Sequence, residues 1–546
     1  MPTDVANLPA DIVCEVFMQA ASTDPPRFLS NYERRRRTEQ KWTLGWIYLT
    51  HVCHGWRLIG LDLAPLWAAL VTFFPSPSIA DELLSRSRDC DLRLDLQSIG
   101  SGDLIHMETW VSQHLDRASQ LTVVGKANRD VFREKQLSTL RTLIIRYGRQ
   151  TPGIEIDAPG LREVHLSEGT VLFRSTMPHL TALEISHVYY TAAEMLDVFR
   201  CVPFLERLRI FHGTGRWSGT FPHTIIELQH LAVFDMHASS TEAFLNLWEH
   251  LSVPPSVTVK LVTNDIPDVS ILLSSLHSQL GWPSYDNLII FSSGFSLTCG
   301  EPDPGHGERV SGLKWLFASD RDLGLIALDL LEQLRLHLAI ANIHHCELEL
   351  PSILRELDCA KGDPVALRLD VALHALGVAL KNTTALALQG FEPDPALLRG
   401  LAPRGSSTPF PHLHSLLLGK HQSSWVAQNR LGPGPKVIET DWALVEATLT
   451  ARKQGGVPVQ RLVLAGQWCI REKVTQSWTS QWSRHSVRCR DMNLVMEVED
   501  ERVLETICDS CNIPELETVS SDQLEEELGT DEWGSDEEPD SSEDEE

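Results

Sequence analysis

A short apolar pattern recurs along the middle of the chain at a nearly constant interval. It reads L-x-x-L-x-L or a close variant and begins at Leu140, Leu161, Leu180, Leu205 and Leu231, so that successive starts are 21, 19, 25 and 26 residues apart. A segment with alternating apolar residues, 257–261, begins 26 residues after the last of these starts. Alternation with a period of two predicts short strands with one buried face, and the regular interval predicts a repeated structural unit.

The segments between these strands favour helices. Residues 192–202 have apolar side chains at helical spacing, and a proline that would end such a helix stands just before several strands, at Pro159, Pro178, Pro203 and Pro255. We therefore predict one strand and one helix in each repeat. Further strand-like segments lie at 334–336, 348–350, 367–369, 386–388, 413–418 and 462–464, so we expect the stacking to continue to about residue 500.

The interval and the strand pattern resemble leucine-rich repeats, which recur about every 20 to 29 residues. The resemblance implies an α/β solenoid over residues 71–500, with a possible break at the Gly- and Pro-rich segment 296–312 and with loops that bind partners. The asparagine that commonly follows the strand is missing, and Ser167, Ser186 and His237 stand there instead. We therefore expect irregular repeats, and an unrelated α/β domain is the alternative interpretation.

Two apolar stretches near the N-terminus predict a pair of packed helices. The first, residues 8–17, has apolar residues at every fourth position and a proline in the first turn, namely Leu8, Ile12, Val16 and Pro9. The second, residues 46–67, has apolar residues on one face of a helix, namely Leu49, Val52, Cys53, Trp56 and Ile59. We expect these residues to form the buried stripe of each helix.

These two stretches resemble an F-box. The residues that carry the resemblance are Leu8-Pro9, Ile12, Val16-Phe17, Val52-Cys53, Trp56-Arg57 and Pro65-Leu66-Trp67, in a form abundant in mushroom-forming fungi. The resemblance covers residues 5–70, with a loop inserted at 22–41, and an ordinary helical hairpin is the alternative.

In the F-box family, the F-box docks on a Skp adaptor that bridges to cullin in a ubiquitin ligase, and the C-terminal repeats hold a protein target. The resemblance thus implies a substrate receptor rather than an enzyme. It assigns the adaptor contact to Leu8, Pro9, Ile12, Val16, Val52, Cys53 and Trp56. A scaffold or localisation protein that acts without ubiquitylation is a rival function.

Charge is concentrated at the C-terminal end of the sequence. Residues 515–546 hold sixteen Asp or Glu and no Lys or Arg, and removing these charges from the net charge of −27 leaves −11. This balance argues against a nucleic-acid partner, because phosphate binding requires clustered basic residues. We expect the acidic tail to be disordered and accessible to acidophilic kinases at Ser535, Ser541 and Ser542. A tail that binds basic proteins is a further alternative function.

Other patterns bear on compartment and chemistry. The eleven cysteines are irregularly spaced, and no stretch predicts a signal peptide or a membrane span, so we expect a cytoplasmic or nuclear protein without a membrane partner. Cys508 and Cys511 have the spacing of zinc ligands, but no second pair accompanies them. We found no catalytic or phosphate-binding motif, and we expect no catalytic residues, no metal and no cofactor.

Overall fold

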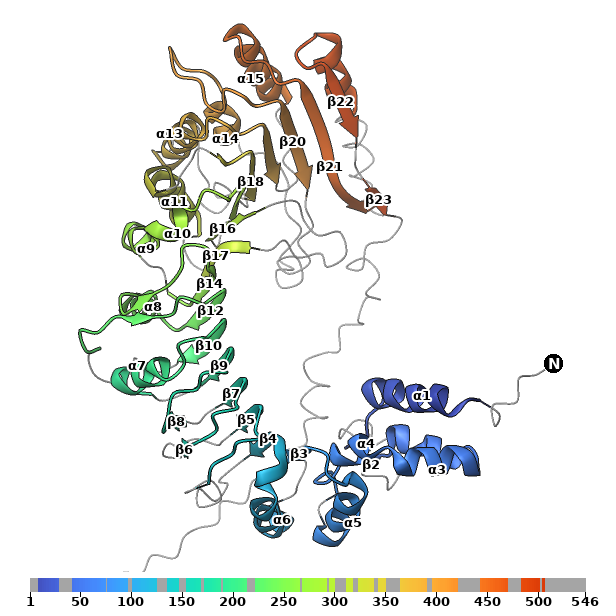
Figure 1. The fold of residues 1–546 in the computed structure, drawn as a ribbon. Coiled ribbons are helices and arrows are strands. Elements are labelled where there is room, and N and C mark those ends of the chain that lie inside the picture. The colour runs from blue at the N-terminus through green and yellow to red at the C-terminus, as the bar shows by residue number, and fades with distance from the viewer. Residues whose placement is uncertain are drawn as a thin grey trace, which may run out of the picture.

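In the computed structural model of the chain, the described residues are 8–28, 42–74, 76–96, 101–124, 135–146, 154–167, 171–187, 190–213, 221–265, 268–291, 294–299, 311–317, 323–337, 342–349, 364–389, 395–420, 442–469, 483–500 and 503–505. They form a group of N-terminal helices followed by one long, mostly parallel sheet that bends into an arc (Figure 1). The fold is therefore mixed α/β, as predicted.

The N-terminal unit is built from short helices. They are α1 (Ala10–Thr23), the 3₁₀ helix η2 (Gly45–His51), α3 (His54–Asp62), α4 (Ala64–Ala68) and α5 (Pro77–Ser87). Two short antiparallel strands, β1 (Arg27–Phe28) and β2 (Trp42–Thr43), join α1 to η2. Most of the expected insertion at 22–41 lies outside the described residues, although α1 extends through Thr23.

The predicted single helix over residues 46–67 is wrong. Cys53 has an extended backbone, with φ −156° and ψ 174°, and its Sγ accepts a hydrogen bond from the Trp56 N–H at 3.4 Å. It therefore begins α3 as an N-cap, two residues after η2 ends at His51. Leu63 then separates α3 from α4, in which Pro65 occupies the first turn. The apolar residues of this stretch are therefore distributed over three short helices, η2, α3 and α4, that surround one core.

The sheet is continuous across the whole arc. In spatial order its strands are β3 (Leu92–Asp95), β4 (Ala118–Val124), β5 (Thr142–Arg146), β7 (Glu163–Ser167), β9 (Ala182–Ser186), β10 (Arg207–Gly213), β12 (Val233–Ala238), β14 (Thr258–Thr263), β17 (Ser311–Phe317), β16 (Gly294–Thr298), β15 (Asn287–Phe291), β18 (His345–Glu349), β19 (Ala385–Gln389), β20 (Ser415–Lys420), β21 (Arg461–Cys469) and β22 (Glu497–Asp500). A short strand, β23 (Val503–Glu505), also pairs with β21. Neighbouring strands are parallel except at β16, which is antiparallel to both of its neighbours.

This order confirms the predicted strands at 143–145, 183–185 and 208–210. They belong to β5, β9 and β10 of one parallel sheet, with β7 between the first two. The strands on either side of the Gly- and Pro-rich segment 296–312 also belong to this sheet, because β14 pairs with β17 and β15 pairs with β18.

The helices that connect the strands cover the outer side of the arc (Figure 1). They are α6 (Ser101–Gln113), the 3₁₀ helix η3 (Leu115–Arg117), α7 (Ala192–Arg200), α8 (Thr241–Trp248), α9 (Val269–Ser275), α10 (His277–Leu280), α11 (Leu323–His337), α13 (Pro364–Ala379), α14 (Pro395–Gly400) and α15 (Trp442–Gln454). The helix predicted at 192–202 is confirmed as α7. It begins with a capping box, in which Thr191 and Glu194 satisfy each other's backbone N–H groups.

The prediction of one helix in every repeat is wrong for the two shortest intervals. Between β5 and β9 the described return segments are the short strands β6 (Ile154–Ile156) and β8 (Val171–Phe173), which pair in parallel. Intervals of 21 and 19 residues leave less chain for the return than the 25 residues that accommodate α7 and the 26 residues, from 231 to 257, that accommodate α8. In the other 26-residue interval, 205–231, the described return segment is likewise a short strand, at residues 226–227. Another short parallel pair, β11 (Ile226–Glu227) and β13 (Leu251–Ser252), lies further along.

Two strands expected further along the chain are helical instead. Residues 334–336 lie in α11 and residues 367–369 lie in α13. Leu334 is fully buried whereas Leu336 is 61% exposed, so the two leucines do not share one face as they would in a strand. The expected strands at 348–350, 386–388, 413–418 and 462–464 are confirmed in β18, β19, β20 and β21, although β20 begins only at Ser415 and residue 350 lies outside the described part.

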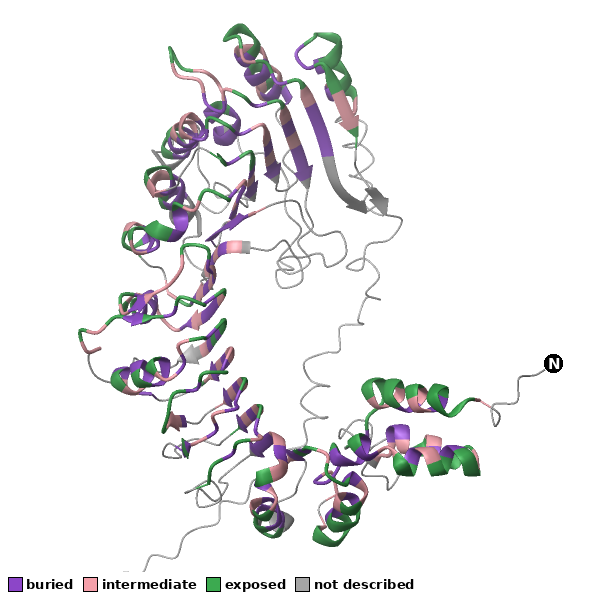
Figure 2. Ribbon diagram, in the orientation of Figure 1, coloured by how far each residue is buried: buried purple, intermediate pink, exposed green. Residues whose placement is uncertain are grey.

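The core lies between the strands and the outer helices (Figure 2). Alternate strand residues point into it, such as Leu143, Ile145, Val164, Leu166, Leu183 and Ile185, which are at most 2% exposed. Burial of one such side chain contributes about 1.5 to 3 kcal/mol. The intervening residues face the inner, concave side of the arc. Among the described helices, none is long and apolar enough to cross a membrane.

Candidate functional site

Four aromatic rings hold the N-terminal unit together. The ring of Phe17 lies 6.0 Å from the rings of Trp46 and Trp56, and Trp46 lies 5.0 Å from Trp67, all with tilted or edge-to-face geometry. Such pairs contribute about 0.5 to 1.5 kcal/mol beyond their buried area. Trp67 also donates a hydrogen bond from Nε1 to the Gly60 carbonyl at 2.9 Å. These contacts fix α1, η2, α3 and α4 relative to one another.

Glycine allows α1 and α3 to approach closely. A Cβ atom added at Gly60 would lie 2.7 Å from Cζ of Phe17, which is far inside contact distance. At the other end of α1, Gly45 has φ +52°, and a Cβ atom there would lie 2.3 Å from the Asp24 carbonyl oxygen. Only glycine suits that conformation and that spacing without strain.

The structure divides the seven residues assigned to the adaptor contact by burial. Pro9, Ile12 and Val52 are exposed, with Ile12 at 47% and Val52 at 50%. Leu8, Val16 and Cys53 are half-buried, and Trp56 is only 6% exposed. Ile12 and Val52 therefore present apolar surface to solvent. Trp56 lies in the core, so it affects a partner contact only by holding the helices in place.

The predicted buried stripes of the two helices are wrong in part. In α1 the buried residues are Val13 and Phe17, one position further along than Ile12 and Val16. Val52 lies at the turn between η2 and α3, where it is exposed. An apolar residue outside the buried stripe of a small helical unit has no internal partner to cover it, which makes it a candidate for a binding surface.

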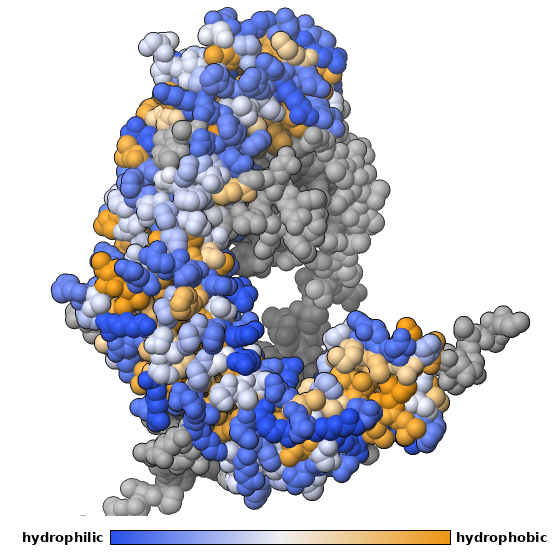
Figure 3. Space-filling model, viewed as in Figure 1, coloured by the Kyte–Doolittle hydropathy of each residue, from blue (hydrophilic) through white to orange (hydrophobic). Residues whose placement is uncertain are grey.

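Other exposed apolar residues on the same unit were not predicted from the sequence. They are Met18, Tyr48, Leu58 and Leu61, with exposures of 46%, 49%, 56% and 37%. Leu58 lies two residues from Trp56 in α3, which places it on the opposite side of the helix. This spacing is the sequence signal that could have predicted the exposure of Leu58. Figure 3 shows apolar residues gathered over this unit. Its outer surface is therefore a candidate for docking another protein.

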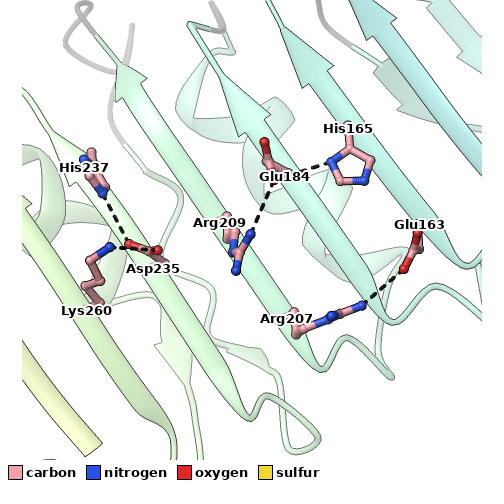
Figure 4. A network of polar contacts seen from close by, with 8 residues as sticks. All are labelled: Glu163, His165, Glu184, Arg207, Arg209, Asp235, His237 and Lys260. Atoms are coloured by element: carbon pink, nitrogen blue, oxygen red, sulfur yellow. Dashed lines mark hydrogen bonds and ion pairs between the residues drawn. The ribbon is translucent and has the colours of Figure 1, made fainter. Parts of the chain in front are cut away.

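The inner face of the sheet is a second candidate surface, and it is charged (Figure 4). The labelled side chains come from five neighbouring strands, β7 to β14, and are Glu163, His165, Glu184, Arg207, Arg209, Asp235, His237 and Lys260. They occupy the positions between the apolar residues of the repeated pattern. The apolar pattern of the sequence did not predict this charged surface.

Ion pairs connect these charges along the face. Arg207 Nη2 lies 3.2 Å from Glu163 Oε1, and it reaches across β9 where the intervening residue is the small Ala182. Glu184 Oε2 lies 3.4 Å from His165 Nδ1 and 3.9 Å from Arg209 Nη1.

Asp235 is the central carboxylate further along the same face. Its two oxygens lie 3.5 Å from His237 Nε2 and 3.5 Å from Lys260 Nζ. The side chain of Asp235 is 11% exposed, whereas that of Lys260 is 39% exposed. The pairs around Glu163 and Glu184, whose side chains are 30% to 53% exposed, contribute about 0 to 1 kcal/mol each, so a partner can exchange them at little cost.

The same face becomes apolar toward the far end of the arc. Ala387, Leu417 and Val463 are neighbours in register on β19, β20 and β21. Ala387 and Leu417 are half-buried, and Val463 is buried. The inner face of the sheet therefore has a charged section at β7 to β14 and apolar positions at β19 to β21.

The described residues contain no group of three His, Cys, Asp or Glu side chains that could hold a metal ion. Cys346 is buried in β18 while its neighbours His345 and Glu347 face the other side of the sheet, as the strand geometry requires. Cys508 and Cys511, with their zinc-like spacing, lie outside the described residues.

No model of a known protein family matches the chain, and no curated protein matches it.

Proposed function

We propose that this chain is the substrate-receptor subunit of a cullin-based ubiquitin ligase. In this proposal the N-terminal unit is an F-box that docks on a Skp adaptor, and the arc is a leucine-rich-repeat-like solenoid that holds a protein target. The chain then contributes proximity, because it brings the target to the enzyme that transfers ubiquitin.

The observation that carries this proposal is the exposed apolar surface of the N-terminal unit. Its aromatic core is complete within the unit, yet Ile12, Val52 and Leu58 remain about half exposed. Ile12 and Val52 are also among the residues that carry the sequence resemblance to the F-box. A unit that buries its aromatic residues internally and presents aliphatic residues outward suits docking by apolar burial.

The inner face of the sheet supports the second half of the proposal. Its charges come from many strands held in register, so they form a rigid pattern rather than a flexible one. Charged pairs at a protein surface select among partners and steer their association. The proposed target surface is therefore the section from β7 to β14, and the apolar positions at β19 to β21 lie further along the same sheet, beyond β17, β16, β15 and β18.

A co-purification experiment tests the adaptor half. The full-length chain, produced with the Skp adaptor of the same organism, should retain the adaptor. Ile12→Ala with Val52→Ala should weaken adaptor binding about tenfold, because two half-exposed aliphatic side chains each lose about 0.7 kcal/mol or more of new burial. Ile271→Ala is the matched control, since Ile271 is 53% exposed on α9, far along the arc.

Two outcomes would redirect the proposal. If adaptor binding is absent, or equally strong in the double variant, the N-terminal unit is not an adaptor-docking F-box. If the adaptor binds but cullin-dependent ubiquitylation of co-purified proteins is not detected, the rival function of a scaffold without ubiquitylation is favoured. Loss of all co-purified proteins on deletion of residues 515–546, with the adaptor retained, would favour a tail that binds basic proteins.

A further inference from the structure

Positive charge is in excess on four adjacent strands of the inner face. Between β10 and β17 the described inner-face positions carry Arg207, Arg209, Lys260 and Lys314, with Asp235 as the one carboxylate among them. Two further carboxylates, Glu163 and Glu184, reach the arginines from the neighbouring strands. This is an unusual local balance in a chain whose net charge is −27.

The excess is greatest where two lysines oppose each other. Lys260 on β14 and Lys314 on β17 are register partners, and neighbouring strands lie only about 4.8 Å apart. Lys260 forms an ion pair with Asp235, whereas Lys314 forms no ion pair with any residue that the structure describes. Like charges placed opposite one another in a sheet are destabilising. An anionic group bound between them would remove this repulsion.

The chain carries such an anionic group in its own sequence. Residues 515–546 hold sixteen carboxylates and lie outside the described part, and the last described strand, β23, ends at Glu505. From β22 to β17 there are seven strand-to-strand steps, or about 34 Å along the sheet. Thirty residues of extended chain span about 100 Å, so residues near 535 can reach Lys314 with slack remaining.

We propose that the acidic segment 515–546 docks on the inner face between β10 and β17, where its carboxylates bind Arg207, Arg209, Lys260 and Lys314. The segment then occupies part of the surface that we assign to the target and competes with it. Phosphate groups on Ser535, Ser541 and Ser542 would strengthen the docking, because each adds further negative charge. The proposal does not depend on adaptor binding, which involves the other end of the chain.

Tethering favours this occupant over an unlinked acidic protein. A segment joined to the body by a short linker has an effective concentration of about 1 mM at its site, so weak charge contacts suffice to hold it. The sequence also has a run of four arginines at residues 34–37, which is a competing position for the same segment.

Zero-length cross-linking of the full-length chain tests the proposal. A carbodiimide joins carboxylates to lysine amines that touch them, and mass spectrometry identifies the joined peptides. At low salt the expected products link residues 515–546 to Lys260 or Lys314. At 0.5 M NaCl their yield should fall at least about fivefold, because contacts between exposed charges are screened.

A pair of variants isolates the charge contacts. Arg207→Gln with Arg209→Gln leaves both lysines in place and should lower their cross-links to the tail about fivefold, the effect of removing two exposed charge contacts. Arg399→Gln, at an exposed position on outer helix α14, is the control and should change nothing. Circular dichroism verifies that each variant is folded, and the salt dependence of the unmodified chain provides a test that needs no variant.

Three results would overturn the proposal. The first is an absence of links to Lys260 and Lys314. The second is a predominance of links to Lys41, beside the basic cluster 34–37. The third is links that join two different molecules, detected by mixing unlabelled and ¹⁵N-labelled chains before cross-linking. None of these measurements includes the adaptor, so their failure is distinct from a failure of the proposed function.

Discussion

Substitution of Gly60 by alanine tests how tightly α1 and α3 are packed. The new Cβ atom would lie 2.7 Å from Cζ and 2.9 Å from Cε1 of Phe17. That ring is fully buried between Trp46 and Trp56, so it cannot move aside without disturbing both indoles. Overpacking of this kind costs about 1 to 3 kcal/mol, and the better helix propensity of alanine returns about 1 kcal/mol. We expect a net destabilisation of the N-terminal unit of up to about 2 kcal/mol.

Gly55 provides a matched control in the same helix. A Cβ atom at Gly55 would meet only Cys53 Sγ, at 3.9 Å, so Gly55→Ala should stabilise α3 by up to about 1 kcal/mol. Hydrogen exchange of the α1 and α3 amides in the full-length chain reports the local opening free energy. Gly60→Ala should lower their protection about tenfold, since 1.4 kcal/mol corresponds to that factor. Equal effects of the two substitutions would refute the close packing of Phe17 against Gly60.

Two further predictions concern buried polar groups in the arc. Tyr190 Oη donates a hydrogen bond to the Val171 carbonyl at 2.9 Å and accepts one from the Val171 N–H at 2.8 Å. Tyr190→Phe should therefore destabilise β8 and α7 by about 1 to 3 kcal/mol, measured by hydrogen exchange. Tyr48→Phe, at an exposed position, is the control and should have no effect. Burial raises the pKa of the Cys489 thiol from 9.0 to about 11, and the charge of Glu446 acts in the same direction. Between pH 9 and 11 the unfolded chain therefore loses this proton while the folded chain keeps it, so the free energy of unfolding should fall by about 2 to 3 kcal/mol more in the unmodified chain than in Cys489→Ala. Equal falls in urea titrations at the two pH values would contradict this burial.

Strands were predictable where the apolar pattern alternated over a full repeat. The pattern beginning at Leu180 placed β9 correctly because two buried leucines or isoleucines of one strand must be an even number of residues apart. The same short signature misled at 334–336, because a leucine-rich helix also contains leucines two positions apart. Strands outside the pattern, such as β3 and β16, were not anticipated.

The candidate docking surface was predictable only in part. The apolar residues of the N-terminal unit were recognised, but which of them are buried depends on where the chain breaks at Cys53. That break rotates Val52 outward and leaves Phe17 to fill the core. Helical periodicity assumes one uninterrupted axis, so it cannot report such a change of direction.

The sequence by itself determined the mixed α/β class and those strands, such as β5, β9 and β10, whose apolar residues alternate over a full repeat. These follow from local periodicity and from the need to bury one face of each strand. Only the tertiary structure decided which charges meet on the inner face. Lys260 and Lys314 are 54 residues apart in the sequence, yet they are register partners on β14 and β17. The antiparallel pair β15 and β16 lies between these two strands in the sequence but not in the sheet. Sequence distance carries no information about such neighbours, since strand order is set by packing of the whole sheet.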